Sequence, residues 1–186
     1  MNELTNQEIE KLVEQAKSEM SAFNSIYQYF LPKIYGYVYN RVNGDRHVCE
    51  DLTSMIFEAV VLSLPNYRVQ EGGTFKAFIY RIAHNKVIDY YNKNKRGFLS
   101  IFSKKIENEP SFENDPQDTN ILESEIIKKE LSNLRPKDQL ILSLKYYSEL
   151  ENNEIAEVLD TKVSNVSVLI HRALKKLREK VKSKLL

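Results

Sequence analysis

The sequence predicts an all-α protein made of two small helical domains joined by an acidic flexible linker. Glycine and proline number five each among 186 residues, about 5% of the chain together, against roughly 12% in average proteins. This is too little turn chemistry for a fold with many β-hairpins. Apolar residues recur at steps of three and four over long segments, which is the spacing of one helix face. Residues 106–125 hold seven acidic residues, two prolines and no lysine or arginine, which is typical of a linker between domains.

The N-terminal domain is expected to span residues 1–97 and to contain three to four helices. In the segment 21–42 the apolar side chains share one helix face, and Pro32 either kinks this helix or begins a new one. Asp45 is a suitable N-cap for a second helix, which ends at Pro65.

The third helix of this domain is expected over residues 75–96, with Thr74 as its cap and Gly97 at its end. It lies in a basic segment, residues 72–97, where six lysines and arginines face one aspartate and the net charge is +5. The net charge of the whole chain is only +1. Because charge acts locally, this distribution is compatible with an anionic partner such as nucleic acid.

The C-terminal domain is expected to span residues 123–186 and to contain four helices. A first helix over 121–134 is followed by Pro136, which suits the first turn of the next helix. A short helix over 151–158, a tight connection and a long last helix form a helix-turn-helix pattern, in which the second helix of the pair enters the major groove of DNA. The residues expected to pack the pair together are Ile155, Ala156, Val158, Leu159, Val163, Val166 and Ile170.

The same composition excludes several function classes. A single cysteine, Cys49, rules out an internal disulfide framework and a cysteine-based zinc site, and is expected to be a buried small residue. We find no nucleophile–base pair, metal-ligand cluster or glycine-rich phosphate loop, so the sequence predicts neither an enzyme nor a metal or cofactor site. The N-terminus is polar where an export signal is apolar, and no apolar run approaches the roughly 20 residues of a membrane span. The prediction is a cytoplasmic protein without membrane insertion.

Three stretches carry a resemblance to a known family. They are EDLTSMIF at 50–57, FKAFIYRIAHN at 75–85, and NEIAEVL at 153–159 leading to HRALKKLR at 171–178. In this order, and separated by an acidic linker, they resemble the extracytoplasmic-function (ECF)-like, two-domain group of bacterial sigma-70 factors. The resemblance implies a subunit that binds core RNA polymerase and directs it to promoter DNA, and it suggests an anti-sigma factor as a further partner. It identifies 1–97 with sigma region 2, 98–122 with the linker and 123–186 with sigma region 4.

By this resemblance, the helix after Asp45 carries the main polymerase contact, which docks on the clamp coiled coil of the largest subunit. We expect Phe57 to be an exposed aromatic anchor among carboxylates, which suits a basic helical partner. A solvated face without a partner is the alternative reading of the same pattern. The contact candidates are Asp51, Leu52, Thr53, Ser54 and Phe57.

The loop and helix around residue 75 combine aromatic, amide and cationic side chains, which are the groups that hold unstacked bases. By resemblance, this helix recognises the minus-ten element, Arg81 and Asn85 read or clamp it, and the loop of Tyr67 receives a flipped base. Phe75 is expected to be structural. Phe78 stands where the family usually has tryptophan, and Asn92 and Asn94 stand where arginines are more usual. The minus-ten candidates are Tyr67, Arg68, Tyr80, Arg81, His84, Asn85 and Lys86.

The start of the last helix presents polar side chains to a duplex minus-thirty-five element. Asn165 and Ser167 are candidates for base readout, and Arg172 and Lys175 for phosphate contacts. The chain departs from the family at Val168 and Leu169, which replace polar residues and are expected to contact thymine methyls or a partner protein. Asp160 stands where the family commonly has glycine. The minus-thirty-five candidates are Lys162, Ser164, Asn165, Ser167, His171, Arg172 and Lys175.

Two alternatives remain at this point. One is a helix-turn-helix regulator that binds DNA without polymerase, and the other is a sigma-like paralogue that binds polymerase or a partner but reads promoters weakly. The acidic linker has three readings: a solvated spacer, a segment that enters the polymerase channel, or a shield over the basic faces of the free protein.

Overall fold

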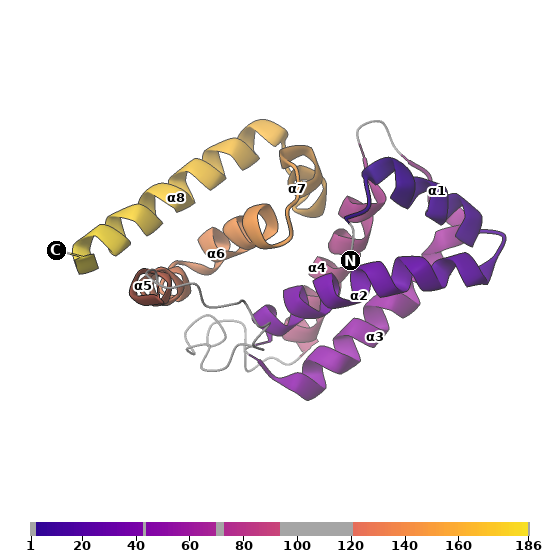
Figure 1. The fold of residues 1–186 in the computed structure, drawn as a ribbon, viewed down its shortest axis with the longest axis horizontal. Coiled ribbons are helices and arrows are strands. Elements are labelled where there is room, and N and C mark those ends of the chain that lie inside the picture. Colours follow the sequence, from indigo (N-terminus) through magenta and orange to yellow (C-terminus); the bar gives the residue numbers. More distant parts are fainter. Residues whose placement is uncertain (1–2, 43, 70–72, 94–120, 186) are drawn as a thin grey trace.

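The computed structural model describes residues 3–42, 44–69, 73–93 and 121–185, with the side chains of 121–125 and 185 outside the description. Over these ranges the chain is helical and contains no strand, which confirms the predicted all-α class. Figure 1 shows the helices α1–α4 gathered in one body and α5–α8 in a second body beside it. The interpretations of the acidic linker fall on residues outside these ranges.

Four helices form the N-terminal domain, namely α1 (Asn6–Ala16), α2 (Met20–Arg41), α3 (Arg46–Ser63) and α4 (Phe75–Lys93), with a short 3₁₀ turn at Leu64–Asn66. Helix α2 continues through Pro32, so the alternative that a new helix begins there is wrong. Asp45 caps α3 as predicted, and its carboxylate accepts a hydrogen bond from the backbone N–H of Val48 at 3.1 Å.

Helix α1 was not among the helices expected individually. A capping box begins it, in which Thr5 and Glu8 each accept a hydrogen bond from the other's backbone N–H. Ile9, Val13 and Ala16 are buried against the rest of the domain, so a narrow apolar stripe anchors an otherwise polar helix.

Aromatic and branched side chains from all four helices form the core of this domain. The rings of Phe30 and Phe75 meet edge to face with centroids 5.8 Å apart, and both side chains are fully buried. Cys49 is buried as predicted, and burial raises the pKa of its thiol to about 11. The thiol is therefore held in its unreactive, protonated form at neutral pH.

The C-terminal domain contains α5 (Ile121–Ser132), α6 (Pro136–Leu142), a π-helical turn at Ser143–Tyr147, α7 (Asn152–Val158) and α8 (Val163–Leu185). These elements match the predicted order, with α7 and α8 as the helix-turn-helix pair. None of the described helices combines the length and apolar character needed to cross a bilayer.

The contact between α7 and α8 follows the predicted core at most positions. Ile155 and Val166 are fully buried, and Leu159 and Ile170 pack at its edge. Val163, however, is 47% exposed, so its predicted packing is wrong. It is the first residue of α8, and a helical side chain covers the turn that precedes it, which is absent here. Asp160, where the family commonly has glycine, adopts the left-handed φ of 48° between the two helices.

The two domains contact each other directly through α4 and α7. The hydroxyl of Thr74 donates to Glu154 at 2.6 Å, and the ammonium of Lys76 donates to the backbone carbonyl of Glu149 at 2.7 Å. Glu154 is only 1% exposed, and its second carboxylate oxygen accepts the backbone N–H of Glu151 at 2.7 Å. A buried carboxylate that bonds both domains makes this contact specific.

Candidate functional site

The exposed face of α3 is acidic and partly apolar. Asp51 and Ser54 are exposed, as predicted for contact residues, and Met55 beside them is 43% exposed. The side chain of Ser54 donates to the backbone carbonyl of Glu50 at 3.0 Å. The carboxylate of Glu50 is paired with Arg46 at 2.9 Å, and Asp51 is an exposed carboxylate on the same helix.

Three candidates on α3 face inward. Leu52, Thr53 and Phe57 are buried, with 4–5% of each side chain exposed. The expectation of an exposed aromatic at Phe57 is wrong, because its ring packs edge to face against Tyr27 of α2 at 4.7 Å between centroids. Tyr27 itself is 37% exposed. The aromatic that solvent reaches at this surface is thus contributed by the neighbouring helix.

Two aromatic candidates for base contact are also buried. Tyr80 is fully buried, and its ring meets that of Tyr37 edge to face at 5.5 Å, so its placement on the polar side of the helix is wrong. Helical spacing alone did not show that the side of α4 bearing Tyr80 is covered by packing. Tyr67 is 7% exposed, and its ring packs against Phe75 and Phe78.

The remaining minus-ten candidates lie on the surface of the loop and α4. Arg68, Arg81 and Asn85 are exposed, whereas Lys86 and His84 are half-buried. The guanidinium of Arg68 donates to the backbone carbonyls of Pro65 and Tyr67, which fixes it over the turn. Exposed cationic and amide groups on one loop and one helix can hold a phosphate backbone and the edges of unstacked bases.

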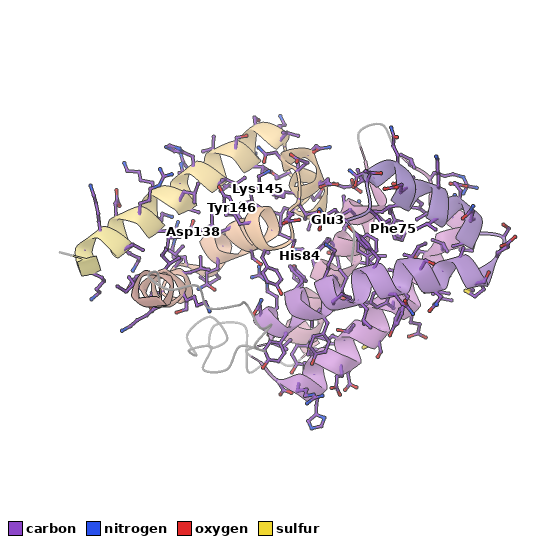
Figure 2. All side chains as sticks on the ribbon, in the orientation of Figure 1. Glu3, Phe75, His84, Asp138, Lys145 and Tyr146 are labelled. Atoms are coloured by element: carbon purple, nitrogen blue, oxygen red, sulfur yellow. The ribbon has the colours of Figure 1, made fainter. Side chains whose placement is uncertain are left out.

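His84 has an electrostatically distinct position. Its Nδ1 lies 3.2 Å from the hydroxyl of Tyr37, and burial together with the positive charge of Arg41 lowers the pKa of its imidazole to about 4. Figure 2 shows His84 in the region between the two domains, with Lys145 and Tyr146 on the C-terminal side. His84 is therefore neutral at pH 7 and serves as a hydrogen-bonding group.

Part of the surface of α4 is covered by the C-terminal domain. The Thr74–Glu154 bond lies in this contact. Burial raises the pKa of the Glu157 carboxyl of α7, and the positive charge of Arg81 on α4 partly opposes that rise. The contact with α7 therefore covers the start of α4 around Thr74, whereas Arg81 and Asn85 stay exposed.

A substitution at Thr74 tests this contact. Thr74→Val keeps the side-chain shape but removes the hydroxyl that donates to the buried Glu154. We expect this loss to weaken the contact between the two domains by about 1–3 kcal/mol. Energy transfer between dyes on α1 and α8 should fall in this variant. Thr74 also caps α4 through the N–H of Ala77, so the control is Thr74→Ser, which keeps the hydroxyl and should preserve the wild-type signal. Unchanged transfer in Thr74→Val would contradict the role of this bond.

All seven minus-thirty-five candidates are exposed, six of them on the first four turns of α8 and Lys162 just before it. The amide of Asn165 donates to Thr161 at 3.3 Å, and Ser167 accepts the amide of Asn152 at 3.1 Å. These bonds hold the two readout candidates at the helix surface. Val168 and Leu169 are 47% and 39% exposed, so the apolar departure from the family pattern faces solvent.

One cation of α8 is used inside the domain. The ammonium of Lys176 donates to Asp138 at 2.7 Å, and Arg135 donates to the same carboxylate oxygen at 3.0 Å. Burial alone would raise the pKa of Asp138, but these two bonds hold it below its ordinary value. Lys176 therefore ties α8 to α6, whereas Arg172, Lys175 and Arg178 are exposed on the same helix.

Sequence reasoning missed Glu10, Tyr27 and Arg41. Glu10 of α1 bonds to both ends of the loop before α4, and the guanidinium of Arg41 lies over the ring of Tyr37 at 5.4 Å. Local periodicity carries no signal for such contacts between distant segments. Among the residues described by the structure, no group of three His, Cys, Asp or Glu side chains is placed to hold a metal ion.

Comparison with known proteins gives matches over both domains. Residues 26–97 match the family described as Sigma-70 region 2, and residues 124–177 match Sigma-70, region 4. The ECF RNA polymerase sigma factor ShbA of Streptomyces griseus is 33% identical over 144 residues, 75% of each chain. The ECF RNA polymerase sigma factor SigW of Bacillus subtilis is 29% identical over 94% of this chain and 97% of its own length.

Two solved structures share the fold. CnrH, in complex with the cytosolic domain of CnrY, aligns with a TM-score of 0.61 at 21% identity over 92% of this chain and 96% of its own. The sigma factor RpoE of Bartonella quintana, in complex with the anti-sigma factor NepR, aligns with a TM-score of 0.65 at 17% identity over 86% of this chain and 96% of its own. At these identities the likeness concerns the arrangement of helices.

Proposed function

This chain belongs to the sigma-70 family of RNA polymerase sigma factors, in its ECF group, and from that membership we propose that it binds core RNA polymerase and directs it to promoters. The observation that carries the proposal is the presence of two polar helix faces on separate domains, one on α4 and one on α8. Such a chain can contact two promoter elements at once.

We assign polymerase binding to residues 1–97, through the exposed face of α3. Asp51 and Ser54 supply polar contacts, and Tyr27 and Met55 supply apolar area at the same surface. Leu52, Thr53 and Phe57 support this face from below as buried packing residues.

We assign capture of the melted minus-ten strand to the loop before α4 and to α4 itself. Arg68, Arg81 and Asn85 are exposed and suited to phosphates and base edges. Tyr67 and Tyr80 are core residues in the structure, so they act by shaping the surface of the domain. Tyr67 contacts a base only if the loop after it rearranges. Half-buried Lys86 and His84 lie beside the exposed residues.

We assign the minus-thirty-five duplex to residues 123–186, through the first four turns of α8. Asn165→Ala should weaken binding to the cognate element by about 1–3 kcal/mol and relax base preference, because an asparagine amide can pair with adenine. Lys175→Ala should weaken binding to all sequences alike. It should also reduce the slope of log affinity against log salt concentration by about one. Affinity measured against salt, on cognate and scrambled duplexes, separates the two roles. Equal loss on both duplexes for Asn165→Ala would contradict base readout.

The chain acts by binding and not by catalysis, in the cytoplasm, where its polymerase lies. Because RpoE of Bartonella quintana was solved with an anti-sigma factor, we propose that a protein of that class is a further partner of this chain. The segment 98–122 serves as the acidic connection between the domains.

A second candidate function is favoured by one observation. Val163, Val168 and Leu169 expose apolar surface on the helix that would read the minus-thirty-five element. A sigma-like paralogue that binds polymerase or a partner protein, with weak promoter readout, would show such a surface.

Run-off transcription with core polymerase lacking its own specificity subunit separates these functions. Specific transcripts from a subset of promoters support the sigma factor. Co-elution with core enzyme without transcripts supports the weak-readout paralogue. DNA binding without co-elution supports a polymerase-independent helix-turn-helix regulator and overturns the main proposal.

A further inference from the structure

One turn of the C-terminal domain is attached to the N-terminal domain beside the contact of α7 with α4. It follows the π-helical segment Ser143–Tyr147, a kind of helix that is rare and occurs frequently at functional sites. Glu149, two residues later, adopts the left-handed φ of 52°, which side chains other than glycine rarely adopt. In this conformation its backbone carbonyl accepts the ammonium of Lys76 on α4 at 2.7 Å. The strained residue thus presents its carbonyl to the other domain.

The side chain of Tyr147 occupies space on α2 that a glycine leaves open. Gly36 is buried in the second half of α2. A Cβ atom added to Gly36 would lie 3.2 Å from Cζ of Tyr147 and closer still to its hydroxyl oxygen, and the three atoms nearest to that Cβ all belong to Tyr147. Glycine weakens a helix relative to alanine. Its presence at this position therefore makes room for a tyrosine of the other domain.

The arrangement of the two domains in the structure, which we call closed, keeps the two proposed DNA-reading helices near each other. Helix α7 packs against both α4 and α8, and Figure 1 shows it at the junction of the two bodies. One helix, about 10–12 Å wide with its side chains, thus lies between α4 and α8. Elements at minus ten and minus thirty-five are about 25 base pairs apart, or about 85 Å along B-DNA at 3.4 Å per pair. The closed chain is therefore too short to contact both elements at once.

We propose that the turn Tyr147–Glu149 is a latch that holds the free chain closed, and that this contact between the domains is autoinhibitory. Its two attachment points are Tyr147 at Gly36 and the Glu149 carbonyl at Lys76. Promoter binding by both domains requires the open chain, so its apparent affinity is reduced by the fraction of the chain that is open. This inference rests on the proposed function, because closing inhibits only if α4 and α8 contact two separate promoter elements.

Gly36→Ala tests the first attachment point. The added methyl group takes the space of the Tyr147 hydroxyl, whereas alanine suits the interior of α2. Energy transfer between dyes on α1 and α8 of the free full chain should fall, and circular dichroism should show no loss of helix. Ser25→Ala is the matched control, because Ser25 is an exposed residue of the same helix. Unchanged transfer in Gly36→Ala, or an equal fall in Ser25→Ala, would overturn the latch.

Tyr147→Ala tests the same attachment point from the other domain and leaves α2 unchanged. The transfer should fall to the level of Gly36→Ala, and the double variant should show no further fall, because both changes remove one contact. Wild-type transfer in Tyr147→Ala would overturn the latch even if Gly36→Ala disturbed its own helix.

A reversible lock tests whether closing inhibits. Lys76→Cys and Glu149→Cys place two thiols at the second attachment point, where a short reducible cross-linker can join them, while the native Cys49 is buried and protonated. With core polymerase, the locked chain should give about tenfold fewer run-off transcripts or less, and reduction of the cross-link should restore them. Equal transcription before and after reduction would overturn the inference. Absence of transcripts from the wild type would instead overturn the proposed function, whereas the energy-transfer test would still stand.

Discussion

Asp51→Arg is expected to abolish binding to core RNA polymerase while leaving the fold intact. Asp51 is exposed on α3, so a longer cationic side chain meets no packing obstacle there. If this face docks on a basic helical partner, the substitution places like charges together, which costs several kcal/mol. We expect the affinity for core enzyme to fall by about 100-fold or more, measured by gel filtration or by fluorescence anisotropy of labelled protein.

The control for Asp51→Arg is Glu19→Arg. It changes the charge equally at an exposed position at the start of α2. Circular dichroism should give the same helicity and the same melting temperature for both variants. Wild-type affinity in Asp51→Arg would remove this face of α3 from the polymerase interface, and an equal loss in Glu19→Arg would indicate a nonspecific charge effect.

Acidification is expected to destabilise the protein through His84. The folded-state pKa of this histidine is about 4, against 6.5 in the unfolded chain. As the pH falls below 6.5, the unfolded chain takes up a proton that the folded chain excludes, so the free energy of unfolding falls until the pH reaches about 4. The pKa difference corresponds to a loss of about 3 kcal/mol.

The groups around His84 explain this direction. Tyr37 of α2 bonds to its Nδ1, and the guanidinium of Arg41 opposes a second positive charge. His84→Gln keeps a polar, neutral side chain and should lose this part of the pH dependence. Denaturant unfolding at pH 7 and pH 4 measures it, and subtracting the variant from the wild type removes the separate effect of carboxylates such as Asp138, whose pKa is lowered.

The matched control is His47→Gln, which replaces an exposed histidine on α3. It should lose stability on acidification as the wild type does. Identical pH profiles for wild type and His84→Gln would contradict a neutral, buried His84.

Most of the helices could be predicted from local patterns. The apolar repeat along α2, the cap at Asp45 and the helix-turn-helix spacing all depend on residues within a few turns of one another. Helix α1 was harder to predict, because only Ile9, Val13 and Ala16 carry its buried stripe among mostly polar residues. The exposed polar residues of α8 were predicted well because a helix end that packs on one neighbour leaves the rest of its surface free.

The errors came from faces covered by more than one neighbour. The helical pattern predicted that Phe57 and Tyr80 face solvent. In the structure the ring of Tyr27 packs against Phe57, and the ring of Tyr37 packs against Tyr80. The bonds of Thr74 with Glu154 and of Tyr67 with Glu10 join residues 80 and 57 positions apart. No periodicity reports such pairs, because they depend on tertiary packing and on the contact between domains.

Permanganate footprinting of a promoter bound by core polymerase and this chain tests most directly whether one domain opens DNA while the other grips the duplex. Thymines around minus ten should become reactive, and the minus-thirty-five duplex should be protected from nuclease in the same complex. Asn165→Ala should weaken the protection and leave the reactivity of the thymines in the bound complex unchanged. A bound complex whose thymines react no more than with core polymerase alone would contradict the account.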